Sequence, residues 1–190
     1  MKDFTIGLDV DGVLADFVGK VLYYQNSIFK TKFQQSDMTS YHIETILGES
    51  NLATILEIME NNQDVKYFDL IPGAIELVTA LRHLGKVVFV TAPCRKYRAW
   101  SDDRKFWLKQ HFLAKEKDIV SLKDKTLFNG QVLIDDANSN INEWIASGRP
   151  AIRISQPWNN NGKGLLANNL SDIPDMVSSI KNIIINDKNW

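Results

Sequence analysis

Short runs of consecutive apolar residues, separated by helical patterns, are the feature that most constrains the fold of this chain. The runs lie at residues 4–8, 86–90, 118–122, 131–134 and 151–154. Several are apolar on successive residues, which is typical of strands that helices cover on both faces. Strands that alternate with helices predict an α/β fold with a mostly parallel sheet.

Apolar residues at helical spacing predict the helices between these strands. Ile75, Val78, Leu81 and Leu84 repeat on one helical face, and Gly85 follows as a C-cap. Similar patterns predict helices near residues 100–112, 141–147 and 176–184.

The stretch between the first two strands is too long for one crossover helix. It runs from Asp9 to Lys86, so residues 16–70 are predicted to form an inserted, mainly helical cap subdomain. Residues 1–15 and 71–190 would then form the core domain. Residues 159–164, with the sequence NNNGKG, are expected to form a mobile surface loop.

Charge and cysteine content exclude several classes of function. The 190 residues carry a net charge of -1, which gives no basic field for a nucleic-acid polymer. Cys94 is the only cysteine, so an internal disulfide is excluded and a reducing cytoplasm is favoured. No segment has the pattern of a membrane span or a signal peptide. A cytoplasmic location is therefore predicted.

Acidic and hydroxyl side chains follow the predicted strands where each strand ends. They are Asp9 and Asp11 after the first strand, Thr91 after the second, and Asp135 and Asp136 after the fourth. The carboxyl ends of parallel strands share one edge of a sheet, where ligands bind. These groups are therefore expected to converge, and crowded carboxylates need a cation. Hard oxygen ligands without Cys or His suit Mg²⁺.

The spacing around the first strand also suits a reacting group. Residues i and i+2 of an extended segment point the same way, so Asp9 and Asp11 can face one atom. Gly12 allows a sharp turn and a close approach of the backbone to a ligand. Lys125, ten residues before Asp135, can bring a positive charge to the same edge. These are the parts that phosphoryl transfer to an aspartate requires.

The sequence resembles the haloacid dehalogenase-like (HAD) phosphatases. The motifs are residues 8–14 (LDVDGVL), 90–92 (VTA) and 133–136 (LIDD). Within that superfamily the chain is most similar to the 5'(3')-deoxyribonucleotidases. Softer motifs carry that likeness: residues 15–17 (ADF), 72–74 (PGA), 107–108 (WL) and 123–126 (KDKT). The resemblance implies a three-layer Rossmann-like sheet with a small helical cap inserted after the first strand.

The resemblance also implies roles for individual residues. Asp9 would attack phosphorus and form an aspartyl-phosphate, while Asp11 would protonate the leaving alkoxide and then activate water. The Asp9 carboxylate, the Asp11 carbonyl and Asp135 would hold Mg²⁺. Thr91, Ala92 and Lys125 would bind the phosphate, and Asp136 would orient water or Lys125.

Two further sets of residues follow from the same resemblance. Related nucleotidases carry a lysine three residues before the helix tryptophan. Here Arg104 occupies that place with Lys105 beside it, and either can reach the site. Phe17, Tyr41 and Phe68 are the candidates for stacking on a nucleobase. Aromatic stacking on a base contributes about 1–3 kcal/mol, which favours a deoxynucleoside monophosphate as substrate.

Other readings stay open at this point. The same chemistry fits a sugar phosphate or another small phosphoester, and a non-catalytic module phosphorylated on aspartate is a third reading. The base, the sugar, the phosphate position and the oligomeric state, including a homodimer, are not fixed by the sequence. His42, His83 and His111 lie away from the strand-end motifs in the sequence and are assigned no role.

Overall fold

All strands of the sheet run parallel, as predicted. The computed structural model describes residues 4–94 and 96–186. Its sheet has the order β3-β2-β1-β4-β5-β6. The strands are β1 (Thr5–Leu8), β2 (Lys86–Thr91), β3 (Ile119–Ser121), β4 (Val132–Asp135), β5 (Ala151–Ile154) and β6 (Leu165–Ala167). The α/β class is confirmed.

Strand β6 is the one element of the sheet that the sequence did not predict. It has three residues, lies at the edge beside β5, and exposes Leu165 and Leu166. Strand β3 is equally short, but it lies in the longer predicted run 118–122, whereas the apolar residues of β6 stand between Gly164 and Asn168.

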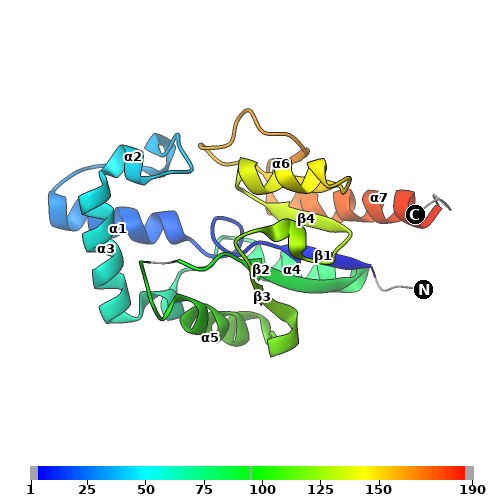
Figure 1. The fold of residues 1–190 in the computed structure, drawn as a ribbon, viewed down its shortest axis with the longest axis horizontal. Coiled ribbons are helices and arrows are strands. Elements are labelled where there is room, and N and C mark those ends of the chain that lie inside the picture. Colours follow the sequence, from blue (N-terminus) through cyan, green and yellow to red (C-terminus); the bar gives the residue numbers. More distant parts are fainter. Residues whose placement is uncertain (1–3, 95, 187–190) are drawn as a thin grey trace.

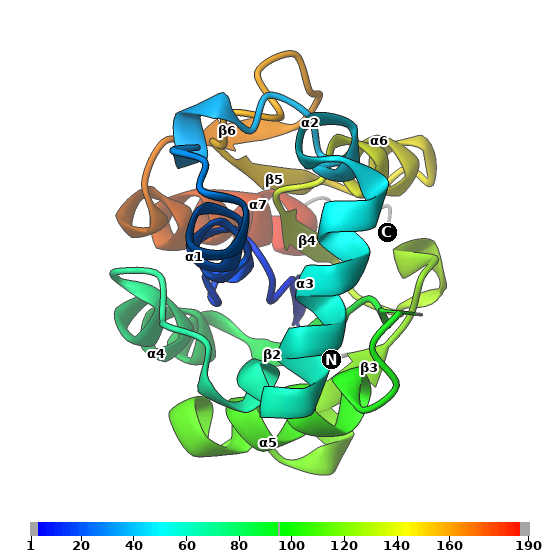
Figure 2. The ribbon, with the colours of Figure 1, turned by 90° about the vertical axis from the view of Figure 1, so that its left-hand side faces the viewer.

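Helices cover both faces of the sheet and make it three-layered (Figures 1 and 2). Helices α4 (Ala74–Leu84), α5 (Trp100–Phe112) and α7 (Ile173–Asn186) pack on the face to which Ile6 and Leu8 point. Helix α6 (Asn138–Ala146) packs on the opposite face, against Val88 and Val90. Alternate residues of β2 and β4 thus enter separate apolar cores, which explains their unbroken apolar runs.

One close contact on the α6 face requires a glycine. A Cβ atom at Gly7 of β1 would lie 2.8 Å from Cε1 of Phe128. That ring cannot easily move, because it stacks on Trp144 of α6 with ring centroids 6.1 Å apart. The absence of a side chain at Gly7 therefore lets this layer approach β1.

The segment between β1 and α4 is helical and lies beyond the carboxyl ends of the strands (Figure 1). It contains α1 (Phe17–Phe29), α2 (Glu44–Leu47) and α3 (Glu49–Asn62), with 3-10 turns at Gln35–Asp37 and Asp64–Tyr67. This is the helical cap that the fold class predicted.

The chain enters and leaves the cap side by side. The Asp16 amide donates to the Asp69 carbonyl at 2.9 Å, and the Ile71 amide donates to the Leu14 carbonyl at 2.8 Å. Both bonds lie next to the predicted limits at residues 16 and 70. The division into a cap and a core domain stays a prediction, and its outer limits at residues 1 and 190 fall outside the described residues.

Helix α1 begins where the chain enters the cap. The Asp16 side chain accepts a hydrogen bond from the Gly19 amide at 2.8 Å and so caps the first turn. This cap places Phe17 at the first helical position, close to the end of β1. In the described ranges, no helix is long and apolar enough to cross a membrane.

Candidate active site

The turn after β1 brings the first two carboxylates to the edge of the sheet. The Asp9 amide continues the ladder to Ile134 of β4 at 2.9 Å, and the Val10 carbonyl accepts the amides of Leu14 and Ala15. Gly12 has a φ of +78°, and a Cβ atom there would overlap Oδ2 of Asp136. Glycine therefore serves both the turn and the close approach to the second acidic segment.

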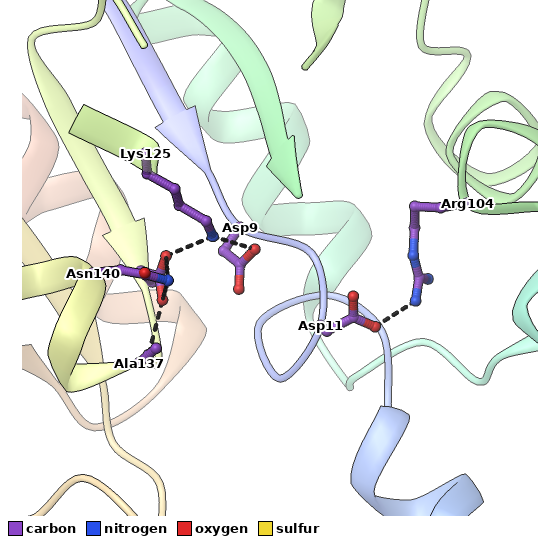
Figure 3. A network of polar contacts seen from close by, with 7 residues as sticks. Asp9, Asp11, Arg104, Lys125, Ala137 and Asn140 are labelled. Carbon is purple, nitrogen blue, oxygen red and sulfur yellow. Dashed lines mark hydrogen bonds and ion pairs between the residues drawn. The ribbon is translucent and has the colours of Figure 1, made fainter. Parts of the chain in front are cut away.

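A buried lysine bridges two of the carboxylates (Figure 3). Lys125 Nζ lies 2.6 Å from Asp9 Oδ1 and 2.7 Å from Asp135 Oδ2. Asp135 also accepts the Ala137 amide at 2.8 Å, and Asn140 Nδ2 approaches its two oxygens at 3.1 and 3.0 Å. Lys125 and α6 thus fix Asp135 from several sides. The sequence analysis did not single out Asn140. The one feature that could have indicated it is its position in the first turn of α6, just after Asp135 and Asp136.

Three carboxylates lie close enough to share a cation. One oxygen each from Asp9, Asp135 and Asp136 lie within 4.8 Å of one another, and all three residues are buried. The predicted cation ligands were Asp9, Asp135 and the carbonyl of Asp11. The structure adds Asp136 to the cluster, whereas the Asp11 carboxylate turns toward Arg104 (Figure 3).

The donor set fits a hard divalent cation. All of these ligand atoms are oxygens, and Mg²⁺ prefers oxygen ligands from a few carboxylates. Thr91 is buried at the end of β2, and its Oγ1 has no hydrogen-bond partner in the part of the chain that the structure describes. A buried polar atom without a partner is costly, so a ligand at this edge, such as phosphate, would satisfy it.

Burial dominates the electrostatics of the cluster. It raises the pKa of Asp9 to about 7, with the charge of Lys125 opposing and that of Asp135 adding to the effect. Burial also raises the pKa of Asp11 and of Asp136. Burial lowers the pKa of Lys125, but the charges of Asp135 and Asp9 outweigh it and the net pKa is raised. Without a cation, the site therefore favours protonated carboxyl groups beside a charged lysine.

Arg104, and not Lys105, contacts the turn that carries Asp11. Arg104 is wholly buried on α5, and its Nη2 donates to Asp11 Oδ1. Its guanidinium lies 5.0 Å from the ring centroid of Phe68 and 5.3 Å from that of Trp100. Lys105 is partly exposed and pairs with Glu116 at 2.7 Å.

A cavity of about 290 Å³ opens above the carboxylates. Asp9, Asp11, Lys125 and Asp136 line its polar end. Aromatic and aliphatic side chains line the rest, among them Phe17, Tyr41, Ile43, Leu56, Trp100 and Trp158. The cavity therefore combines a charged end with an apolar body, as small-molecule sites do.

The three predicted base-stacking residues have different positions. Phe17 and Tyr41 line the cavity, whereas Phe68 is only 2% exposed and is not one of the lining residues. The Phe68 ring lies behind those of Phe17 and Trp100, with centroids 6.1 and 6.2 Å away. The sequence indicated Trp100 only as part of a helix. In the structure Trp100, and not Phe68, lines the cavity.

Two sequence expectations need correction. His42 was placed away from the site, yet it lines the cavity, because the cap folds back over the strand ends. Asn159 was assigned to a mobile surface loop, yet it is wholly buried and bonds to the Asp136 carbonyl at 2.7 Å. His42 and Asn159 are far from the motifs in sequence, so only the tertiary structure brings them there.

The raised pKa of Asp9 predicts how stability depends on pH. Its folded value of about 7 lies above the ordinary 3.8, so this contribution to stability is present below about pH 4 and is lost as pH rises through 7. The free energy of unfolding of the cation-free protein should fall across this window by up to about 1.4 kcal/mol per pH unit. Urea unfolding in EDTA measures it.

Asp9→Asn should make this slope shallower, since asparagine does not titrate, while Asp11 and Asp136, whose pKa values are also raised, keep part of it. Exposed Asp175 on α7 gives the matched control, Asp175→Asn, which should keep the slope of the wild type. An equal slope in Asp9→Asn, or stability that rises from pH 4 to 7, would contradict the prediction.

A family model matches most of the chain. The family model described as "5' nucleotidase, deoxy (Pyrimidine), cytosolic type C protein" matches residues 3–183. No curated protein sequence matches the chain.

Several solved structures share the fold at low sequence identity. A HAD family hydrolase from Deinococcus radiodurans, with bound phosphate and sodium, has a TM-score of 0.64 at 15% identity and covers 93% of this chain and 95% of its own. A haloacid dehalogenase-like protein from Agrobacterium tumefaciens has a TM-score of 0.62 at 13% identity and covers 93% and 98%. The HAD-type hydrolase YfnB from Bacillus subtilis, bound to magnesium, has a TM-score of 0.59 at 13% identity and covers 93% and 99%.

The matched family and the shared fold confirm the resemblance inferred from the strand-end motifs. The match spans the cap as well as the core, and therefore includes every candidate site residue. The chain belongs to the deoxyribonucleotidase family of the HAD-like hydrolases and is a phosphoric monoester hydrolase of the 5'-nucleotidase type.

Proposed function

We propose that this enzyme hydrolyses deoxyribonucleoside monophosphates with Mg²⁺, through an aspartyl-phosphate on Asp9. The observation that carries the proposal is the place of Asp9. It lines an aromatic-lined cavity, 2.6 Å from a buried lysine. The neighbouring strand β2 ends at Thr91, whose hydroxyl has no hydrogen-bond partner among the described residues.

The proposed reaction has two displacements. An Asp9 oxygen attacks phosphorus, the ester P–O bond breaks, and the leaving alkoxide takes a proton from Asp11 to give the nucleoside. Asp11 then accepts a proton from water as the water oxygen attacks phosphorus. The P–O bond to Asp9 breaks, which releases phosphate and restores the carboxylate. Thr91, the Ala92 amide and Lys125 bind the phosphate oxygens.

Asp9, Asp135, Asp136 and the main-chain carbonyl of Asp11 would hold the Mg²⁺ ion. When bound, the ion supplies positive charge that neutralises the phosphoryl oxygens. The clustered oxygens of three buried carboxylates support this assignment, as does the magnesium bound to YfnB, which shares the fold.

The cavity walls support a nucleotide substrate. Phe17, Tyr41 and Trp100 offer aromatic surface beyond the charged end, and the family description names deoxy and pyrimidine specificity. Stacking by Phe68 stays a prediction, because its ring is covered in this conformation. The cytoplasmic location and a homodimer likewise stay predictions from the sequence.

Phosphate release from a panel of substrates tests the proposal. Deoxyribonucleoside monophosphates should release phosphate only with Mg²⁺, and faster than sugar phosphates do. Asp9→Asn should reduce release to background, because an amide oxygen is a poor nucleophile. Phosphate release confined to sugar phosphates would contradict the nucleotide assignment. Full activity in Asp9→Asn would contradict the proposed mechanism.

Phe17→Leu separates base recognition from chemistry. It keeps an apolar side chain but removes the aromatic face, so kcat/KM for a deoxynucleotide should fall about tenfold while that for a sugar phosphate stays constant. Phe33→Leu changes a cap aromatic that packs against the core and should leave both values unchanged. An equal fall for both substrates in Phe17→Leu would indicate a structural role only.

Arg104→Met and Lys105→Met form a matched pair on adjacent residues. Arg104 holds Asp11, the proposed acid and base, so Arg104→Met should lower kcat about a hundredfold. Lys105→Met removes only a partly exposed ion pair and should stay within about twofold of the wild type. Steady-state kinetics with thermal melts separates a loss of kcat from a loss of folding. Comparable kcat in the two variants would contradict the assignment.

A further inference from the structure

The segment after β5 folds back onto the carboxylate cluster. Residues 155–164 form this segment, named the strap here. The indole Nε1 of Trp158 donates to Asp136 Oδ2 at 3.0 Å, and the two side chains are only 9% and 3% exposed. Among the hydrogen bonds of the described residues, this one engages one carboxylate oxygen of Asp136 and leaves the other for a cation.

Asn159 locks the strap to the main chain of the same residue. Its Nδ2 donates to the carbonyls of Asp136 and Ile154, both at 2.7 Å, and its Oδ1 accepts the Gln156 amide at 3.0 Å. Asn159 is wholly buried, so each of these bonds is protected from water. Asp136 is therefore held by the strap through both its backbone and its side chain.

A buried arginine organises the rest of the strap. Arg153 of β5 is 4% exposed, and its guanidinium donates to the carbonyls of Asn159, Gly162 and Lys163. Hydrogen bonds from a charged donor are stronger than neutral ones. A Cβ atom at Gly162 would overlap the Arg153 side chain. The strap is thus packed tightly around this one charge.

The strap also touches the other acidic segment. Gln156 Nε2 donates to the Gly12 carbonyl at 2.9 Å, in the turn that follows Asp11. The Trp158 ring meanwhile lines the cavity beside Asp136. One short segment therefore contacts both carboxylate-bearing turns and the space that a substrate would fill.

We infer that Trp158 is a positioning residue, which orients the Asp136 carboxylate for a divalent cation while the strap fixes Trp158 in place. The inference rests on the proposed function, which supplies the cation. Donors behind a metal ligand fix its orientation, and their loss typically weakens metal affinity about 10- to 100-fold.

Trp158→Phe with Mg²⁺ alone tests this inference. Phenylalanine keeps a ring at the cavity wall and removes only the indole donor. Trp144→Phe is the matched control, because the indole of this buried residue also donates a hydrogen bond, to the Pro150 carbonyl at 2.9 Å, on the α6 face. Isothermal titration of the cation-free full chain should give affinity about tenfold weaker in Trp158→Phe and unchanged in Trp144→Phe.

Two further readouts separate positioning from general structure. In the wild type, saturation with Mg²⁺ should shift the indole N–H resonance of Trp158, assigned by its loss in Trp158→Phe, and leave that of Trp144 in place. The Mg²⁺ concentration for half-maximal phosphate release should rise in Trp158→Phe and stay at the wild-type value in Trp144→Phe.

The outcomes distinguish this inference from the proposed function. Equal Mg²⁺ affinity in Trp158→Phe and the wild type, with an unmoved Trp158 resonance, would overturn the inference alone. If the wild type binds no Mg²⁺, both the inference about Trp158 and the proposed Mg²⁺ site are overturned. Mg²⁺ binding that Trp158→Phe weakens supports the inference even where no phosphate is released.

Discussion

The ion bridge from Lys125 to Asp9 and Asp135 is the interaction on which the rest of the site depends. Burying like charges together is unfavourable unless each has a partner. Lys125 is itself buried, so it cannot be solvated if either carboxylate moves away. Strand β1, strand β4 and the turn that carries Lys125 are therefore held in one arrangement by electrostatics as well as by apolar packing.

The bridge leaves the site short of positive charge. Four carboxyl groups lie at this edge, and the buried cations beside them are Lys125 and Arg104. A divalent cation would balance the remaining two charges, and protonation of Asp11 or Asp9 reduces them in its absence. A phosphate that enters with the cation bound would then meet a nearly neutral site. That balance explains why raised carboxyl pKa values and cation binding belong together here.

The strand-end argument predicted which side chains share one edge of the sheet. Asp9, Thr91 and Asp135 stand at the carboxyl ends of β1, β2 and β4, and these strands are neighbours in the sheet. Trp100, Trp158 and His42 could not be predicted in this way. Their positions depend on how α5, the strap and the cap fold over the edge, which no local pattern encodes. Each of these three residues lies on an element whose position depends on contacts with residues far away in the sequence.

Arg104 stands where related nucleotidases carry a lysine, and its surroundings suit an arginine. Phe68, Trp100 and Trp107 surround its guanidinium at 5.0 to 5.3 Å. A planar, weakly hydrated guanidinium stacks on such rings and keeps its charge when buried, whereas an ammonium loses more hydration. Burial lowers the pKa of Arg104, and the charges of Asp11 and Asp9 oppose that shift. In the described structure Nε and Nη1 have no hydrogen-bond partner, so the contacts of this buried guanidinium are its bond to Asp11 and the surrounding rings.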